Sequence, residues 1–280
     1  MHVQALPLQS RDGHAFELRL VRPDAPRAGL LFLPALGVPA RKYDAFALAL
    51  AARGFAVAVH EWRGIGASAL RASRGQDWGY AELLGQDIPA SLAALDPSLR
   101  WCFGGHSLGG QFAAMAAALA PERCAGLVLA ATGVPDRRTF DGYKRWGISA
   151  FARVLPPLTR AVGHYPGEAL GFAGREAGGL MRDWAATVLS GRYLAYGQRE
   201  PLDEALARLR VPALALHFSH DWFVPEASLQ GLLGKLGPGS RAIERFDDAR
   251  LGAHADHFKW MRAAEPVAGA VSDWWSRLSS

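Results

Sequence analysis

The sequence predicts an α/β protein whose mostly parallel sheet is covered by helices on both faces. Short runs that are apolar throughout alternate along the chain with segments of helical spacing, and glycine-rich loops follow several of the apolar runs. Strands buried on both faces read as continuous apolar runs, and strand–helix alternation brings such strands together in parallel. Half of the 280 residues are hydrophobic, which is enough to bury a sizeable core.

The predicted strands are apolar or alternating segments that turn residues bound. The first segment holds two strands around the turn Arg11-Asp12-Gly13, and a glycine loop (63–68) follows a later strand. In chain order the strand segments are 3–21, 28–37, 56–62, 100–105, 126–131, 211–218 and 240–246.

The predicted helices have apolar residues recurring at helical spacing. Gly54 ends the first helix, and Pro89 bends the second because proline cannot donate a backbone N–H to the helical ladder. In chain order the helices cover 43–55, 80–95, the alanine-rich run that ends at residue 120, 226–236 and 265–278.

The segment Gly105-His106-Ser107-Leu108-Gly109 has the form G-x-S-x-G. It lies between a predicted buried strand and the alanine-rich helix, which is the context in which this motif forms a nucleophile elbow. So tight a turn brings together the positions two residues on either side of the serine, and glycine removes the side chains that would collide there. Ser107 then projects above the sheet near a helix N-terminus, whose free N–H groups favour a developing negative charge.

Several stretches in chain order resemble α/β-hydrolases, and the resemblance covers nearly all of the chain. They are LLFLPALGV (30–38), AVAVHEWRGIGAS (56–68), GGHSLGG (104–110), HFSHDWFVP (217–225) and DHFKWMR (256–262). The segment 146–172 resembles the cap of bacterial serine hydrolases near the serine aminopeptidase and monoacylglycerol lipase branch. The resemblance implies an α/β-hydrolase fold and serine hydrolysis, but no particular substrate, because one fold hosts many chemistries.

The irregular segment 133–209 is far longer than the usual connection between elements. We expect it to form a cap over the serine, inserted into a hydrolase core made of residues 1–132 and 210–280. The aromatic side chains of this segment form either the small core of the cap or the wall of an acyl pocket. They are Trp146, Phe151, Tyr165, Phe172, Trp184, Tyr193 and Tyr196.

A serine nucleophile needs a base, and the base needs an acid that fixes its tautomer; in this fold the order along the chain is serine, acid, histidine. Asp221 is the predicted acid because it stands at the end of the strand 211–218. Asp247, Asp248 and Asp256 lie beyond the last strand or in the histidine loop, and we interpret them as solvated loop charges.

Two histidines after the last predicted strand compete for the role of base. His257 is the predicted base, because the run His-Phe-Lys-Trp-Met-Arg resembles the aromatic tail that follows the histidine in related bacterial hydrolases. His254 is the alternative, because Gly252 lies two positions before it and a Gly-His pair is the usual pattern of the family.

Two backbone N–H donors are needed to bind a tetrahedral oxyanion. The resemblance implies Leu108, the residue after the nucleophile, as one donor. Many relatives carry His-Gly before the second donor; this chain has Pro34-Ala35, so the implied donor is the N–H of Leu36, with Gly37 giving the loop room.

The fragment His254-Ala255-Asp256-His257 resembles the end of the metal motif H-x-H-x-D-H, but glycine occupies position 252, where the motif has its first histidine. Structural zinc needs about four ligands, so the sequence predicts neither a metal nor a cofactor in the reaction.

Cys102 and Cys124 lie beside apolar runs, and we expect reduced packing residues rather than a disulfide.

Charge excludes some classes of partner. The net charge is +5, but only four of the 31 basic residues are lysine, and the arginines are scattered. Nucleic-acid binding would need a basic stripe with interleaved aromatic residues, which is absent.

No run of 18 apolar residues and no signal-peptide pattern is present, so we expect no stable membrane insertion and a cytoplasmic enzyme.

These observations predict a serine hydrolase that cleaves a carboxylic ester with a small or medium acyl group through Ser107, Asp221 and His257. A cap rich in tryptophan and tyrosine favours an apolar acyl group. A thioesterase, an aminopeptidase or an amidase would use the same residues and remains an alternative. A non-catalytic binding module on the same fold is a further alternative, although such a module would be expected to lack one of the three residues.

Overall fold

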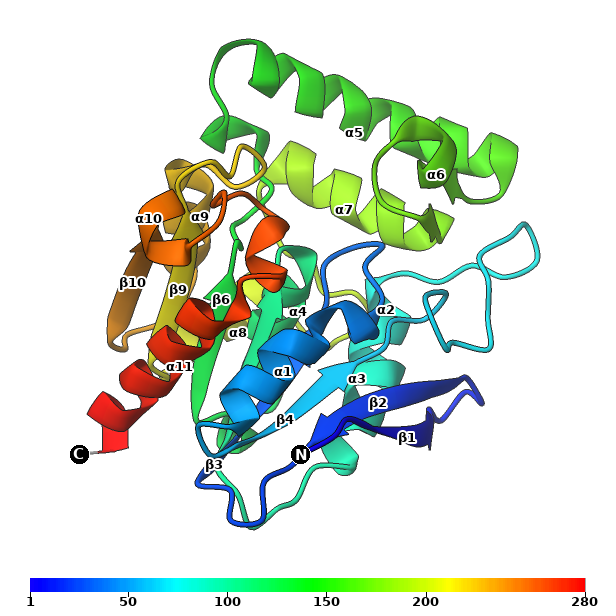
Figure 1. Ribbon diagram of the computed structural model, residues 1–280. Helices are drawn as coiled ribbons and strands as arrows, with labels where there is room; N and C mark the ends of the chain where they lie inside the picture. The colour runs from blue at the N-terminus through cyan, green and yellow to red at the C-terminus, as the bar shows by residue number, and fades with distance from the viewer. Residues whose placement is uncertain (280) are drawn as a thin grey trace.

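The computed structural model describes residues 1–279 and is built around an eight-stranded sheet (Figure 1). The strand order is β1-β2-β4-β3-β5-β6-β9-β10. The pairs β1–β2 and β2–β4 are antiparallel, and all later neighbours in this order are parallel. The strands are β1 (Gln4–Gln9), β2 (Ala15–Val21), β3 (Ala28–Leu33), β4 (Phe55–His60), β5 (Trp101–His106), β6 (Gly126–Ala130), β9 (Ala213–Phe218) and β10 (Arg241–Phe246). Each predicted strand segment therefore holds a strand, and the predicted mostly parallel sheet is confirmed.

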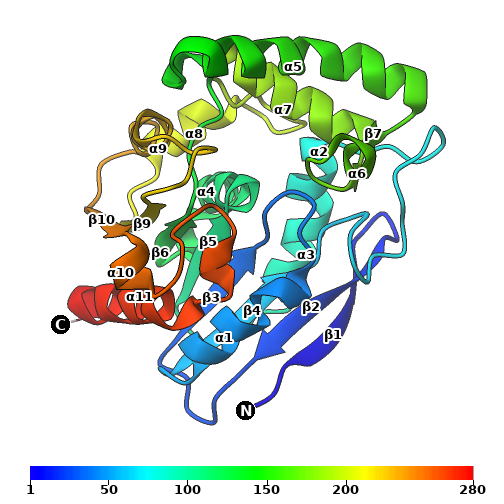
Figure 2. The ribbon, with the colours of Figure 1, turned by 45° about the horizontal axis from the view of Figure 1, so that its top comes forward.

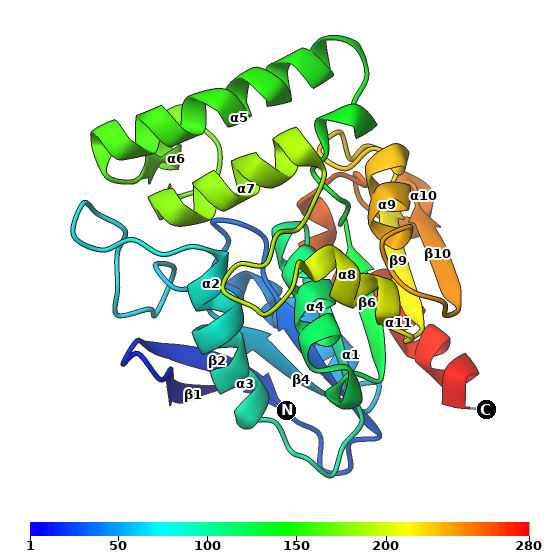
Figure 3. The same ribbon diagram turned by 180° about the vertical axis from the view of Figure 1, so that it is seen from behind.

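Alternation of side chains along each strand divides the apolar residues between two cores. In β3, Leu31 and Leu33 face one core, whereas Leu30 and Phe32 face the other. Helices cover both faces of the sheet (Figure 3). One face is covered by α4 (Leu108–Leu119), α8 (Leu202–Arg208) and α9 (Glu226–Leu233), and the other by α1 (Asp44–Ala51) and α11 (Ala264–Ser279). Burial on both faces is the reason that these strands read as continuous apolar runs.

The predicted helix at 80–95 is not uniform. It begins as α2 (Tyr80–Glu82), passes through a π-helical turn at 83–87 and continues as α3 (Ile88–Ala93). Pro89 lies in the first turn of α3 and offers no N–H to the carbonyl groups of the preceding turn. A π-helical turn thus directly precedes the helix turn that contains Pro89, the residue at which a bend is predicted.

The chain between β6 and α8 forms a layer over the carboxyl ends of the parallel strands (Figures 1 and 2). Its elements are α5 (Gly142–Val162), β7 (Tyr165–Pro166), α6 (Gly167–Leu170), β8 (Arg175–Glu176) and α7 (Gly178–Ser190). α5 and α7 pack against each other over a small apolar core that includes Leu155, Tyr165, Met181 and Val188. α8 also lies within 133–209, but its Leu206 belongs to the main core, so the proposed domain boundaries stay a prediction.

The remaining helical segments are short. They are α10 (Asp248–Leu251) and four 3₁₀ turns, Ala40–Tyr43, Pro121–Arg123, Arg137–Thr139 and Lys259–Met261. Cys102 and Cys124 are both buried and free. Within residues 1–279, no helix combines the length and the apolarity that crossing a bilayer requires.

Candidate active site

Ser107 occupies the tight turn between β5 and α4. Its backbone has φ 55° and ψ −120°. This conformation is unfavourable for any residue that has a side chain, and it occurs mainly at functional sites. A Cβ atom on Gly105 would lie 2.3 Å from the carbonyl carbon of Gly109, and one on Gly109 would lie 2.0 Å from the oxygen of Leu33. Both glycines are therefore required sterically, as the G-x-S-x-G pattern predicts.

Asp221 and His257 form a buried pair at the same end of the sheet. Asp221 follows β9, and His257 lies in the loop between α10 and α11. Nδ1 of His257 and Oδ2 of Asp221 are 2.7 Å apart, and the two residues are 3% and 7% exposed. The other oxygen of Asp221 accepts the backbone N–H groups of Phe223 at 2.9 Å and Val224 at 3.1 Å. The carboxylate is thereby held in one orientation.

The competing residues of the sequence analysis lie elsewhere. Asp247 accepts the backbone N–H of Arg250 and caps α10, and Asp256 accepts the N–H groups of the two residues after His257. His254 is exposed and lies 3.2 Å from Asp248. The structure thus brings His257, and not His254, to Asp221. The members of the fragment 254–257 bind different partners and, among the described residues, do not converge as a ligand set.

His106 is a site residue that the sequence analysis did not identify. Its ring is fully buried, 4.8 Å from that of His257 between ring centroids. Burial lowers the pKa of His106 well below its ordinary value, so that the ring is neutral. The Tyr43 hydroxyl oxygen accepts the N–H of Ala35 at 2.9 Å. The hydroxyl proton can therefore be donated to Nδ1 of His106, which lies 2.9 Å away. The signal in the sequence is the histidine at the variable position of the elbow motif.

The loop between β3 and α1 places Leu36 beside the elbow. The Trp62 indole N–H donates to the carbonyl of Pro34 at 2.8 Å, and the Tyr43 hydroxyl accepts the N–H of Ala35 at 2.9 Å, so both polar groups of the Pro34–Ala35 peptide bond are held. Leu108 is the first residue of α4, and its N–H has no intrahelical partner. Leu36 and Leu108 both line the cavity that contains Ser107.

A cavity of about 500 Å³ lies between the cap and the carboxyl ends of the strands, and both Ser107 and His257 line it. Its wall is predominantly apolar and rich in aromatic residues, among them Phe140, Phe151, Phe172, Trp184, Phe223 and Phe258. Four of these residues lie in the cap segment 133–209, whereas Tyr165 and Tyr193 of the same segment are buried in the packing of the protein. The cap aromatics therefore divide between the two roles that the sequence left open. Among the described residues lining the cavity there is no aspartate or glutamate, and Lys144 is the one lysine.

The comparison with protein families gives one match. The family model described as "Serine aminopeptidase, S33" matches residues 24–170, a range that contains the strands β3 to β6 and the elbow. No curated protein matches the sequence significantly.

Solved structures with the same fold cover almost the whole chain. A hydrolase from Pseudomonas aeruginosa PA01 is 22% identical, with a TM-score of 0.62, and the match covers 97% of this chain and 98% of that chain. The monoacylglycerol lipase of Paleococcus ferrophilus is 20% identical, with a TM-score of 0.62 and coverage of 92% and 98%. The thioesterase domain from the curacin biosynthetic pathway is 17% identical, with a TM-score of 0.63 and coverage of 97% and 99%. These likenesses show that the fold is that of the α/β-hydrolases.

Proposed function

The chain belongs to the serine aminopeptidase S33 family of α/β-hydrolases, and we propose that it is a serine hydrolase that cleaves carboxylic esters with a small or medium apolar acyl group. The observation that carries the proposal is the strained Ser107, which lines one apolar cavity together with the His257 of a buried Asp221–His257 pair. Strain at a polar residue that faces a cavity has a use in nucleophilic catalysis and none in packing.

In the proposed mechanism, Oγ of Ser107 attacks the ester carbonyl while His257 takes the serine proton. Asp221 keeps Nδ1 of His257 protonated and stabilises the imidazolium that forms. The oxyanion binds the N–H groups of Leu36 and Leu108. When the tetrahedral intermediate collapses, the C–O bond to the alcohol breaks and His257 protonates the leaving alkoxide. Water, activated by His257, then hydrolyses the acyl-enzyme and returns the proton to Ser107.

The cavity lining supports an ester over a peptide. An aminopeptidase binds the protonated amino terminus of its substrate, and burying an ammonium group without a carboxylate partner is costly. None of the described residues that line the cavity is acidic. We therefore propose an uncharged acyl group in spite of the aminopeptidase in the family description.

A thioester of the same acyl group is the second candidate, because the aromatic wall would bind the acyl chain equally well whichever atom leaves. The thioesterase domain among the similar structures supports keeping this candidate.

The proposal is tested with a fluorophosphonate probe and a substrate panel. We expect the probe to label Ser107, and the protein to hydrolyse p-nitrophenyl esters with a preference among acyl lengths. Ser107→Ala should lose labelling and hydrolysis by several orders of magnitude, about 10⁶-fold where such losses have been measured, while its melting temperature stays unchanged. A panel of matched ester, thioester and aminoacyl-arylamide substrates ranks the three chemistries. A folded protein that neither reacts with the probe nor hydrolyses any of them is the result expected of a binding module.

A further inference from the structure

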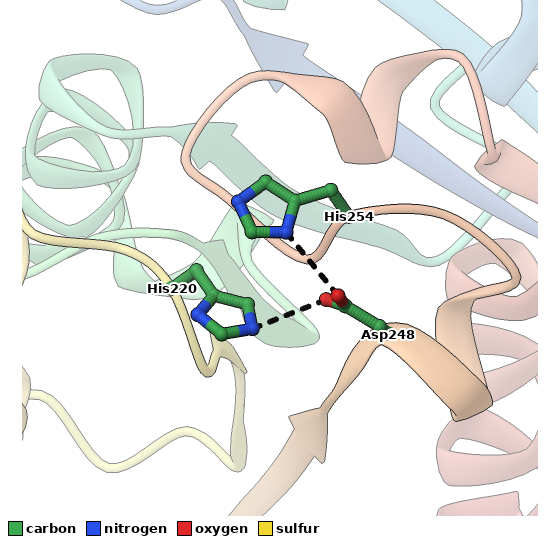
Figure 4. Close-up of side chains that lie close together, drawn as sticks. All are labelled: His220, Asp248 and His254. Carbon is green, nitrogen blue, oxygen red and sulfur yellow. Dashed lines mark hydrogen bonds and ion pairs between the residues drawn. The ribbon is translucent and has the colours of Figure 1, made fainter.

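Three side chains outside the cavity converge on the surface: His220, Asp248 and His254 (Figure 4). Nε2 of His220 lies 3.3 Å from one oxygen of Asp248, and Nδ1 of His254 lies 3.2 Å from the other. The potential ligand atoms of all three residues lie within 4.8 Å of one another. Figure 4 shows a nitrogen of each ring directed at the carboxylate, which lies to one side of both rings.

The backbone holds this arrangement in place. His220 lies in the loop after β9, Asp248 begins α10, and His254 lies in the loop after α10. The N–H of His220 donates to the carbonyl of Ala255 at 2.9 Å, and the N–H of Ala255 donates to Asp248 at 2.8 Å. Hydrogen bonds that orient a ligating carboxylate in this way are typical of the surroundings of metal sites.

The two histidines approach the same carboxylate from stacked positions. The rings of His220 and His254 have their centroids 4.4 Å apart, and a nitrogen of each ring lies beside an oxygen of Asp248. Imidazole nitrogens and carboxylate oxygens are both metal-binding groups, so the three side chains offer a ligand set at one point of the surface.

The donor set selects a class of metal. Two imidazole nitrogens and a carboxylate oxygen suit Zn²⁺ and its transition-metal neighbours, whereas Ca²⁺ and Mg²⁺ prefer oxygen ligands alone. Tetrahedral coordination with bonds of about 2.1 Å places ligand atoms about 3.4 Å apart. The separations of 3.3 Å and 3.2 Å are close to this value. All three side chains are about half exposed, so small rotations about their χ angles can complete the geometry.

We propose that His220, Asp248 and His254 form a surface site for a divalent transition metal of the zinc class, with water completing the coordination. A metal ion bound at this site would join the two loops that carry the proposed acid and base, because His220 directly precedes Asp221 and His254 lies three residues before His257. None of the three ligands lines the cavity. The ion therefore stabilises the two loops and takes no part in hydrolysis.

Calorimetric titration of the full chain with ZnCl₂ tests the site, using protein without a histidine tag that has first been treated with a chelator. We expect binding at one site, no binding of Mg²⁺, and affinity for Zn²⁺ weakened about tenfold or more in His220→Ala and in His254→Ala. His2→Ala is the matched control, because His2 is exposed and lies outside the cluster, and it should bind Zn²⁺ like the wild type.

The melting temperature gives a second readout. Zn²⁺ should raise the melting temperature of the wild type more than that of His254→Ala, because a ligand that binds only the folded state stabilises it in proportion to its affinity. Asp248→Asn keeps an acceptor for the N–H of Ala255 and removes the charge, so it should fold and bind Zn²⁺ weakly. A wild type without measurable Zn²⁺ binding, or Zn²⁺ affinity equal in His254→Ala and His2→Ala, would overturn the proposal.

Discussion

Glu176 in β8 should make the stability of the protein fall as the pH rises through neutrality. The residue is 3% exposed, and one of its oxygens accepts the N–H of Gly174 at 3.1 Å. Burial raises the pKa of Glu176 from 4.5 to about 7 because the charged carboxylate loses its hydration. Between pH 4.5 and about pH 7, the folded protein therefore keeps a proton on Glu176 that the unfolded chain has already released.

The sign and the size of the effect follow from this proton. The stabilisation is fully present below pH 4.5, the value of the unfolded chain, and is lost as the pH rises through about 7. The shift corresponds to roughly 3 kcal/mol at 1.36 kcal/mol per pKa unit, of which about 2.5 kcal/mol is lost between pH 5 and pH 8. For a protein of this size such a loss lowers the melting temperature by about 5–10 °C.

The assay compares the wild type with Glu176→Gln, which keeps the size of the side chain and an oxygen that can accept the N–H of Gly174. Melting temperatures are measured by scanning fluorimetry at pH values from about 5 to 8, and the variant cancels the contribution of all other titrating groups. We expect the wild type to lose about 5–10 °C more than the variant over this range. Parallel curves for the two proteins would refute the reasoning, since Glu176 would then titrate alike in the folded and unfolded states.

Three further predictions concern the elbow, the base and metal independence. His257→Ala should abolish ester hydrolysis and His254→Ala should reduce it at most modestly; the reverse ranking, in proteins of unchanged melting temperature, would reassign the base. Gly109→Ala should destabilise the protein by about 1–3 kcal/mol or more in denaturant titration, because its Cβ would lie 2.0 Å from the oxygen of Leu33. Gly269→Ala, where a Cβ has nothing within 4 Å, is the control and should show no such loss. Prolonged treatment with EDTA should leave hydrolysis unchanged. A loss of activity that zinc restores in His254→Ala, which lacks a ligand of the proposed surface site, as well as in the wild type would contradict a histidine base.

The core of the fold was predictable because its signals are local. A strand buried on both faces is apolar at nearly every position, and β3, β4 and β5 are buried along their whole length. The elbow is equally local, since the glycines that its turn requires lie two residues from Ser107. The spacing of Asp221 from its strand also identified the residue that the structure brings to His257.

The helices of the cap could not be predicted from the sequence for a physical reason. Its helix α5 contains Pro156 and Pro157, and its apolar residues are divided between a small core and the cavity wall. Prolines inside a segment argue against a helix, so the helical spacing of the apolar residues in α5 was missed. Exposed aromatic residues, among them Trp146 at 79% exposure, blur the pattern further.

Contacts between segments that are distant in the sequence could not be predicted either. His220 and His254 belong to loops that follow different strands, and only the parallel pairing of β9 with β10 brings these loops together. The sequence placed His254 in a fragment with its chain neighbours, whereas the folded chain places it against a histidine 34 positions away. Nothing in the spacing of the histidines along the sequence encodes that distance.

The aromatic tail after the proposed base has a structural explanation that links the core to the site. Trp260 is fully buried and stacks on Phe218, the last residue of β9, with the ring centroids 5.8 Å apart. Its ring also lies 5.2 Å from that of His106, beside the elbow. One side chain thus fixes the loop of His257 against the strand that leads to Asp221 and against the turn that holds Ser107. A tryptophan at this position can anchor the base because it is large enough to contact both neighbours at once, and this supports the assignment of the base to the histidine that the tail follows.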